Sequence, residues 1–122
     1  MNALILGGTR FMGKHLVQQL ITDGHDVTIA TRGNAADPFG DKVKRIIVDR
    51  QNANDLAAAF KGKHYDVTVD NLAYCSNDVK ILMDSLSTDK YVMTSTASVY
   101  ANNFHENMKE SEVDTRKIEL KW

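Results

Sequence analysis

Two glycines, Gly7 and Gly13, enclose the stretch of this chain whose residue types and spacing could bind a ligand. An apolar run at residues 3–6 leads into Gly7-Gly8-Thr9-Arg10-Phe11-Met12-Gly13, and an amphipathic segment follows at once. Gly7 can adopt the backbone angles of a tight strand-to-helix turn, and Gly13 lets the helix lie close to the sheet. The free N–H groups and partial positive charge of a helix N-terminus suit a diphosphate. The pattern predicts a nucleotide-binding turn; the alternative is a turn that merely needs glycine.

A magnesium-dependent P-loop is a competing interpretation of the same stretch. Gly8-x4-Gly13-Lys14 supplies most of that motif, and Asp49 and Asp70 each end an apolar strand, where a magnesium-holding aspartate would stand. The next residue is His15, whereas a P-loop needs a serine or threonine hydroxyl there to bind the metal. The P-loop interpretation is therefore disfavoured.

Strand and helix signals alternate along the chain and give the turn its setting. Strands are expected at 3–6, 25–31, 43–48, 66–70 and 90–94, and the first helix at 12–23. Asn52 or Asn54 could cap a short second helix that runs through Phe60, and Ser76 is expected to cap the third helix. The first and last of these helices are expected to bury Met12, Leu16, Val17, Leu20 and Ile21, and Val79, Leu82, Met83 and Leu86. This order predicts an α/β fold, a doubly wound parallel sheet in three αβα layers with strand order 3-2-1-4-5. The ligand crevice is expected outside the carboxyl ends of strands one and four.

Composition argues against several classes of function. The net charge is −1, from 15 Lys+Arg against 16 Asp+Glu, so nothing favours nucleic acid or an anionic membrane as a partner. No apolar run approaches the roughly 20 residues of a membrane span. The lone Cys75 cannot form an internal disulfide; it is expected to be a small buried residue in a cytoplasmic protein. The four histidines have no metal-ligand spacing, and no metal site is expected.

Several motifs in order resemble one known family. LILGGTRFMG, GHDVTIATRGN, VDR at 48–50, VDNLAY at 69–74 and TSTASVY at 94–100 are similar to the NAD-dependent epimerase/dehydratase family, the extended short-chain dehydrogenases/reductases. The resemblance runs from Met1 to Tyr100 and implies a Rossmann domain that holds NAD or NADP. The residues implied at the diphosphate are Gly7, Gly8, Thr9, Arg10, Phe11 and Met12, with Gly13 behind them. Arg10 stands where the family has its middle glycine, and it offers a cation to a phosphate.

The end of strand two bears on which cofactor is bound. NAD-specific relatives place an acidic residue there to hold the adenosine ribose, whereas this chain has Thr31 followed by Arg32. We therefore expect NADP to be preferred over NAD, with Arg32 near the 2′-phosphate; the alternative for Arg32 is a solvated loop cation. The resemblance also implies that Asp49, with Arg50 beside it, contacts the adenine; the alternative for Asp49 is a turn-forming residue.

The resemblance assigns the other half of the site to residues after strands four and five. Leu72, Ala73 and Tyr74 would line the ribose and nicotinamide side, together with Thr94, and Thr96 would be the catalytic hydroxyl that holds the substrate oxygen. Simple packing is the alternative for Tyr74. The hydroxyl groups at this strand end are also ordinary turn chemistry.

The acid/base motif of the family, Tyr-x-x-x-Lys, is absent from the 122 residues: no tyrosine is followed four positions later by lysine. We expect a dinucleotide-binding domain at 1–104 and a charged tail at 105–122 that starts a missing C-terminal part. Such a chain would not be catalytic alone, and its parent would act on a sugar nucleotide or a related substrate. A nucleotide-sensing or regulatory module and a remnant without function are the alternatives. A bare strand-five edge, or the tail, would favour a homodimer.

Overall fold

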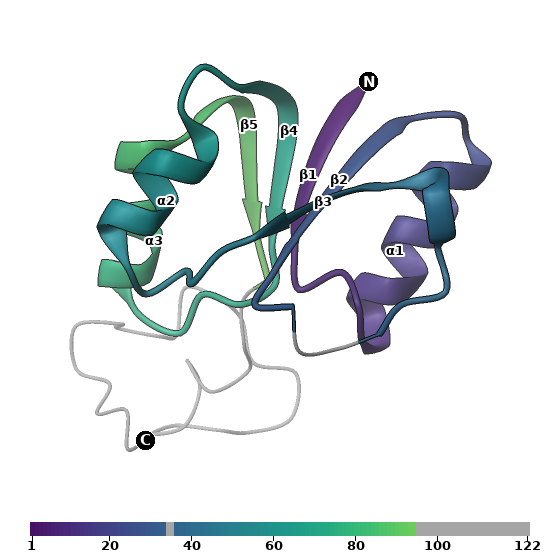
Figure 1. The fold of residues 1–122 in the computed structure, drawn as a ribbon, viewed down its shortest axis with the longest axis horizontal. Helices are drawn as coiled ribbons and strands as arrows, with labels where there is room; N and C mark the ends of the chain where they lie inside the picture. The colour runs from purple at the N-terminus through teal and green to yellow at the C-terminus, as the bar shows by residue number, and fades with distance from the viewer. Residues whose placement is uncertain (34–35, 95–122) are drawn as a thin grey trace, which may run out of the picture.

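The structure is a computed structural model that describes residues 1–33 and 36–94 of the chain. Five strands form one parallel sheet in the order β3-β2-β1-β4-β5, with helices between them (Figure 1). The elements are β1 (Asn2–Leu6), α1 (Phe11–Thr22), β2 (Asp26–Thr31), the 3-10 turn η1 (Gly40–Lys42), β3 (Lys44–Ile47), α2 (Ala53–Phe60), β4 (His64–Asp70), α3 (Ser76–Ser85) and β5 (Ser87–Met93). The predicted α/β class and the strand order 3-2-1-4-5 are confirmed.

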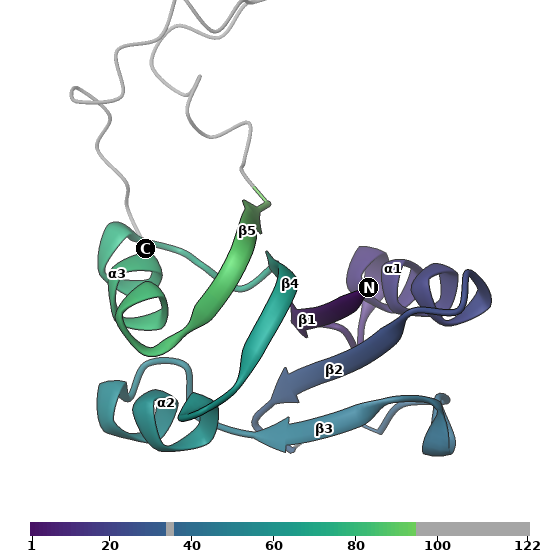
Figure 2. The same ribbon diagram turned by 90° about the horizontal axis from the view of Figure 1, so that it is seen from above.

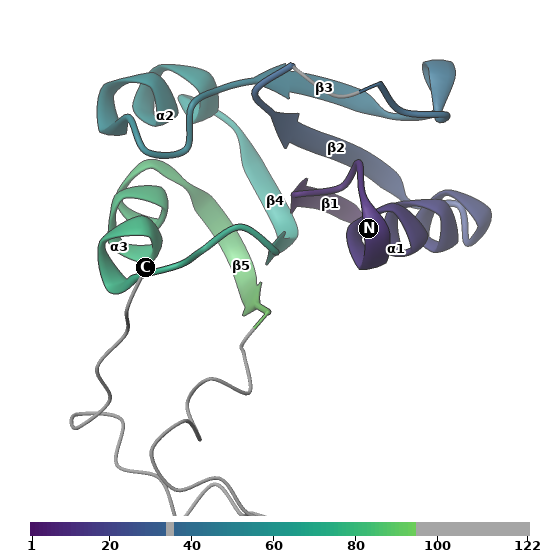
Figure 3. The ribbon, with the colours of Figure 1, turned by 90° about the horizontal axis from the view of Figure 1, so that it is seen from below.

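The sheet has a hydrophobic core on each face because β1 alternates its side chains between the two. Ala3 and Ile5 pack with Val17 of α1 on one face. Leu4 and Leu6 pack on the other face with residues of α2 and α3, namely Leu56, Phe60 and Leu82. Figures 2 and 3 show α1 on one side of the sheet, with α2 and α3 on the opposite side. These are the three layers that the sequence predicted.

The register of the sheet aligns the strand ends that matter for a ligand. Leu6 of β1 is paired with Ala30 of β2 and with Asp70 of β4. Asp70 is paired in turn with Met93 of β5. The loops that leave these four strands therefore start side by side at one edge of the sheet, although they are distant in the sequence.

Several predicted boundaries are wrong by a few residues. β4 begins at His64 and β5 at Ser87, both earlier than expected, because the two polar residues pair with each other in the backbone ladder. Ser76, the expected cap of the third helix, is instead the first residue of α3, and Cys75 holds the N-cap position. The predicted cap of α2 is confirmed, since the Asn52 side chain accepts from the Asp55 N–H at 3.1 Å.

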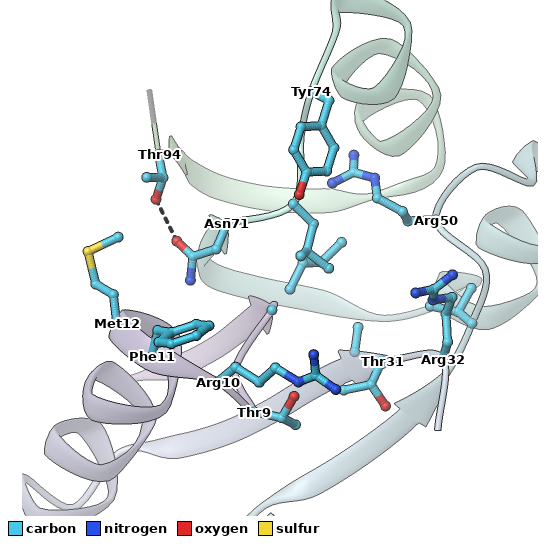
Figure 4. A pocket seen from close by; sticks show the side chains of 16 residues that line it. Thr9, Arg10, Phe11, Met12, Thr31, Arg32, Arg50, Asn71, Tyr74 and Thr94 are labelled. Atoms are coloured by element: carbon cyan, nitrogen blue, oxygen red, sulfur yellow. Dashed lines mark hydrogen bonds between the residues drawn. The ribbon is translucent and has the colours of Figure 1, made fainter. Parts of the chain in front are cut away.

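Two methionines that were expected in helix cores are exposed. Met12 is 61% exposed and Met83 is 41% exposed, whereas Leu82 beside it is fully buried. Met12 lies in the first turn of α1, at the end of the sheet where the ligand crevice opens (Figure 4). Helical spacing shows which face of a helix a residue occupies, but it does not show whether another element covers that residue.

Candidate functional site

The glycine turn has the geometry that its sequence predicts. Gly7 follows β1 with a φ of +81°, in the left-handed region that favours glycine. A Cβ on Gly13 would lie 1.9 Å from the carbonyl oxygen of Gly7, and one on Gly8 would lie 2.9 Å from side-chain atoms of Ile29 and Val17. The turn is therefore packed between β1, β2 and α1 so closely that Gly8 and Gly13 leave no room for a side chain.

The N-terminus of α1, directly behind this turn, has no capping side chain. Arg10 is its N-cap residue, with an extended backbone at φ −136° and ψ 151°, and its side chain makes no capping hydrogen bond. The first turn of the helix carries no acidic residue. The first N–H groups and the positive end of the helix dipole are thus available to an anion.

A cavity of about 510 Å³ opens between this helix end and the carboxyl ends of the strands (Figure 4). We call it the crevice. The predicted cofactor residues that line it are Gly7, Thr9, Arg10, Phe11, Met12, Gly13, Arg32, Arg50, Leu72, Tyr74 and Thr94. Gly8, Asp49 and Ala73 are not among its lining residues, and Thr96 lies outside the described residues.

The two halves of the crevice differ in charge. On the β2 side, the Arg10 side chain extends toward Thr31 and Arg32 (Figure 4). In the described part of the chain neither arginine takes part in a salt bridge. On the β4–β5 side, the lining is uncharged and includes Asn71 and Thr94, whose hydroxyl donates to the Asn71 side-chain oxygen at 2.5 Å.

Arg50 is held by the protein itself rather than left free for a ligand. It is buried, and its Nη1 donates to the Asp70 carboxylate at 2.5 Å while Nη2 donates to the backbone oxygen of Asp78 at 2.8 Å. Its third nitrogen, Nε, is buried without a partner among the described residues. Arg50 therefore joins the end of β3 to β4 and α3 beneath the crevice.

Asp70 is the centre of this buried network. Its carboxylate is fully buried and also accepts from the Tyr91 hydroxyl at 2.7 Å and from the Leu72 N–H at 3.0 Å. Burial, the larger cause, and the hydrogen bond to Asp70 together raise the pKa of Tyr91 well above its usual value. Asp78 in turn accepts from the Tyr74 N–H at 3.0 Å. The two carboxylates thus fix the backbone of the crevice wall that follows β4.

Sequence reasoning missed most of this network, namely Asp70 as an ion-pair partner, Asp78 and Tyr91. It also missed Asn71, which lines the crevice beside Thr94. One signal was available, because an aspartate that closes the apolar run VTVD must be paired if it is buried. The partner could not be found from sequence, since Arg50 lies 20 residues away along the chain.

Two further predicted residues lie elsewhere. Asp49 is exposed, and its carboxylate accepts from the Gln51 N–H at 3.0 Å, in the manner of a turn-forming aspartate. Its contact with an adenine stays a prediction. Cys75 is exposed, so the expectation of a buried cysteine is wrong; it lies in the loop that leads from β4 into α3.

The glycine turn, the uncapped helix and the aligned strand ends are the parts of a dinucleotide-binding α/β domain. Comparison with protein families gives the same answer, because residues 3–85 match the model of the NAD dependent epimerase/dehydratase family. The chain belongs to this family. Proteins of the family bind NAD(P).

A curated relative and several solved structures are similar to the chain. The chloroplast stem-loop binding protein of 41 kDa b from Arabidopsis thaliana is 30% identical over 112 residues, which cover 80% of this chain and 29% of that protein. The epimerase Mth375 of Methanothermobacter thermautotrophicus has a TM-score of 0.76 at 15% identity, covering 92% of this chain and 40% of that one. The UDP-glucose-4-epimerase of Stenotrophomonas maltophila, solved with bound NAD, has a TM-score of 0.69 at 20% identity, covering 91% and 41%.

These matches locate the chain within its family. It spans 29% of the length of the Arabidopsis relative and about 40% of the two epimerases. The shared region is the Rossmann part of the epimerase/dehydratase fold. At these identities the solved structures establish the fold, and the family match over residues 3–85 establishes the relationship.

One group of possible metal ligands lies at the other end of the sheet. Ligand atoms of His64, Asp66 and Asp89 lie within 4.8 Å of one another, which sequence spacing did not reveal. The His64 Nε2 is 3.1 Å from the Asp89 carboxylate, and Asp66 accepts from the Asn2 N–H at 2.7 Å. These groups thus already have partners, and the absence of a metal stays a prediction. Within the described ranges, no helix has the length and apolar character to span a membrane.

Proposed function

We propose that this chain binds NADP(H) in the crevice, in preference to NAD(H). The observation that carries the proposal is the junction of the Gly7–Gly13 turn, the uncapped α1 N-terminus and the β2 end in one cavity. The diphosphate lies against the α1 N–H groups. Fixed N–H donors and the helix dipole stabilise an anion there without rearrangement of the protein.

The preference for NADP rests on the charges at the end of β2. Thr31 and Arg32 replace the acidic residue that would hold the ribose hydroxyls of NAD. Arg10 and Arg32 approach Thr31 from two sides (Figure 4), so two guanidinium groups are available to a ribose 2′-phosphate. Guanidinium groups bind phosphate through paired, charge-assisted hydrogen bonds.

The experiment is calorimetric titration of the 122-residue chain with NADPH and with NADH, for the parent and for Arg32→Met. Loss of a charged hydrogen bond should weaken NADPH binding by roughly 10- to 100-fold and leave NADH binding nearly unchanged. Lys61→Met is the matched control, because it removes one exposed positive charge at the end of α2, away from the crevice. Binding of neither dinucleotide would refute the proposal. Equal affinity for both would refute the NADP preference alone.

We propose binding without turnover for these 122 residues, since they contain no Tyr-x-x-x-Lys. A nucleotide-sensing role is the second candidate. Binding of NADP(H) without reduction of NADP⁺ by sugar nucleotides would favour it. In a longer protein, Thr96 would hold the substrate oxygen during hydride transfer at a sugar nucleotide or related compound. A cytoplasmic location is a further proposal, and cell fractionation would test it. We also propose that the domain ends at residue 104, which limited proteolysis would test.

A homodimer is proposed through the β5 edge, which has β4 as its one sheet neighbour among the described strands. Unpaired backbone groups on such an edge can pair with a second copy. Sedimentation at micromolar concentration tests it, and a strictly monomeric species would refute it.

The Arabidopsis relative is named for stem-loop binding. With a net charge of −1, we propose that nucleic acid is not a partner of this chain, and an RNA stem-loop titration at low salt tests that statement.

A further inference from the structure

Phe11 is the residue whose conformation the fold does least to explain. Its side chain is 86% exposed. Its φ of 49° is the single positive value among the non-glycine residues that the structure describes. A bulky L-residue adopts this left-handed backbone region only at a cost in free energy, and residues that do so cluster at ligand sites.

The protein core gains nothing from the Phe11 ring. The buried residues of α1 are Gly13 and Val17, and Phe11 belongs to neither hydrophobic cluster. The ring instead lines the crevice, as do the exposed side chains of Met12 and Tyr74. An apolar group kept in water at the mouth of a cavity is typical of a ligand-binding surface.

The position of the ring within the crevice selects which part of a dinucleotide it meets. The arginines lie on the β2 side, whereas the Phe11 ring lies on the side of Asn71 and Thr94 (Figure 4). A dinucleotide lies across such a crevice with one nucleotide on each half. With the 2′-phosphate on the β2 side, the nicotinamide falls on the β4–β5 side, where the lining is uncharged.

We propose that the Phe11 ring stacks on the nicotinamide ring of the bound dinucleotide. This rests on the proposed NADP(H) binding. The flat, polarised nicotinamide offers an aromatic side chain a face of matching size, and stacking of this kind contributes measurably to nucleotide binding. The unfavourable backbone at Phe11 then places the ring where the ligand needs it.

The experiment compares a whole ligand with half of it. NADP⁺ and adenosine 2′,5′-bisphosphate, which lacks the nicotinamide, are titrated into the full 122-residue chain and into Phe11→Leu. This variant keeps an apolar side chain and removes the flat ring. Binding of NADP⁺ should weaken on the order of tenfold, while binding of the bisphosphate should stay unchanged. Met83→Leu, at an exposed position on α3, is the control and should alter neither affinity.

The outcomes separate the two proposals. If the parent chain binds neither ligand, the proposed function fails and the inference fails with it. If the parent binds both, but Phe11→Leu weakens them equally or not at all, the stacking is refuted and the NADP site stands.

Phe11→Gly gives a second, independent measurement. Glycine adopts a φ of 49° without strain, so the midpoint of thermal unfolding should not fall, while NADP⁺ affinity should fall at least as far as in Phe11→Leu. A lower midpoint would show that the ring is packed in the free protein, which would overturn the inference.

Discussion

Removal of the Arg50 side-chain charge should be among the most damaging single changes to this fold. Asp70 is fully buried and the Arg50 side chain is 10% exposed, so Arg50→Met leaves a carboxylate in the interior without its counter-charge. Breaking a buried ion pair in this way costs about 3–5 kcal/mol. Asp70 keeps two hydrogen-bond donors, Tyr91 and the Leu72 N–H. We therefore expect a loss of unfolding free energy at the lower end of this range, about 3 kcal/mol.

The assays are urea unfolding and thermal unfolding of the 122-residue chain, both monitored by circular dichroism at neutral pH. A loss of about 3 kcal/mol would lower the midpoint of thermal unfolding by roughly 10 °C for a domain of this size. Lys80→Met is the control, because it breaks an ion pair with Asp84 in which both side chains lie largely in solvent; no resolvable change is expected.

A double-mutant cycle tests whether the loss of stability in Arg50→Met comes from the unpaired Asp70 carboxylate. Asp70→Asn removes the charge and keeps an oxygen that can accept from Tyr91 and Leu72. The double variant Arg50→Met/Asp70→Asn should therefore lose about 1–3 kcal/mol less than the sum of the two single variants. Strict additivity, or an Arg50→Met variant within about 0.5 kcal/mol of the parent, would refute the argument that Arg50 neutralises a buried charge.

Three further predictions concern backbone packing and pH. Gly13→Ala should prevent folding or abolish NADPH binding, since the alanine Cβ would lie 1.9 Å from a backbone oxygen. Gly24→Ala is the control, because a Cβ there meets nothing within 4 Å. Circular dichroism should show that this control variant remains folded. Burial and a hydrogen bond raise the pKa of Tyr91. The stabilisation by the neutral Tyr91 hydroxyl is therefore complete below the tyrosine pKa of the unfolded chain, about 10, and is lost as pH rises further. Tyr91→Phe should make the unfolding free energy fall less steeply at alkaline pH. The hydrogen bond from Arg45 lowers the pKa of Asp37. The stabilisation by ionised Asp37 is therefore present above about pH 4 and is lost as pH falls through the folded-state pKa. Arg45→Met should make the unfolding free energy fall less steeply at acid pH, and an unchanged slope would contradict this prediction.

The parts of this protein that were predictable are those in which a residue acts on its own backbone or its near neighbours. Gly7 has the positive φ that its place between a strand and a helix requires. Asn52 caps α2 through a contact three residues away. Such features need no knowledge of distant residues, and they were confirmed.

Where the sequence-based predictions were wrong, the cause was a contact or a boundary set by the rest of the fold. Met12 is exposed because it lies at the crevice, where the sheet ends, and Met83 is exposed although Leu82 beside it is fully buried. Cys75 is exposed because it lies in a loop outside the core. Arg50 lines the crevice, and its place beside an adenine stays a prediction. Its pairing with Asp70 was not foreseen, because Asp70 ends β4, which β2 and β1 separate from β3 in the sheet.

The sequence by itself determined the strand and helix order, the two-sided pattern of β1, and the glycine turn, because hydrophobic periodicity and backbone sterics are local properties. The tertiary structure decided which side chains meet. Parallel strands that are distant in sequence end at the same edge, so the register of β1, β2, β4 and β5 brings Arg10, Arg32, Asn71 and Thr94 to one crevice. Burial depends on neighbours in space. For that reason only the fold could show that Arg50 belongs to the framework of the crevice while Phe11 faces its opening.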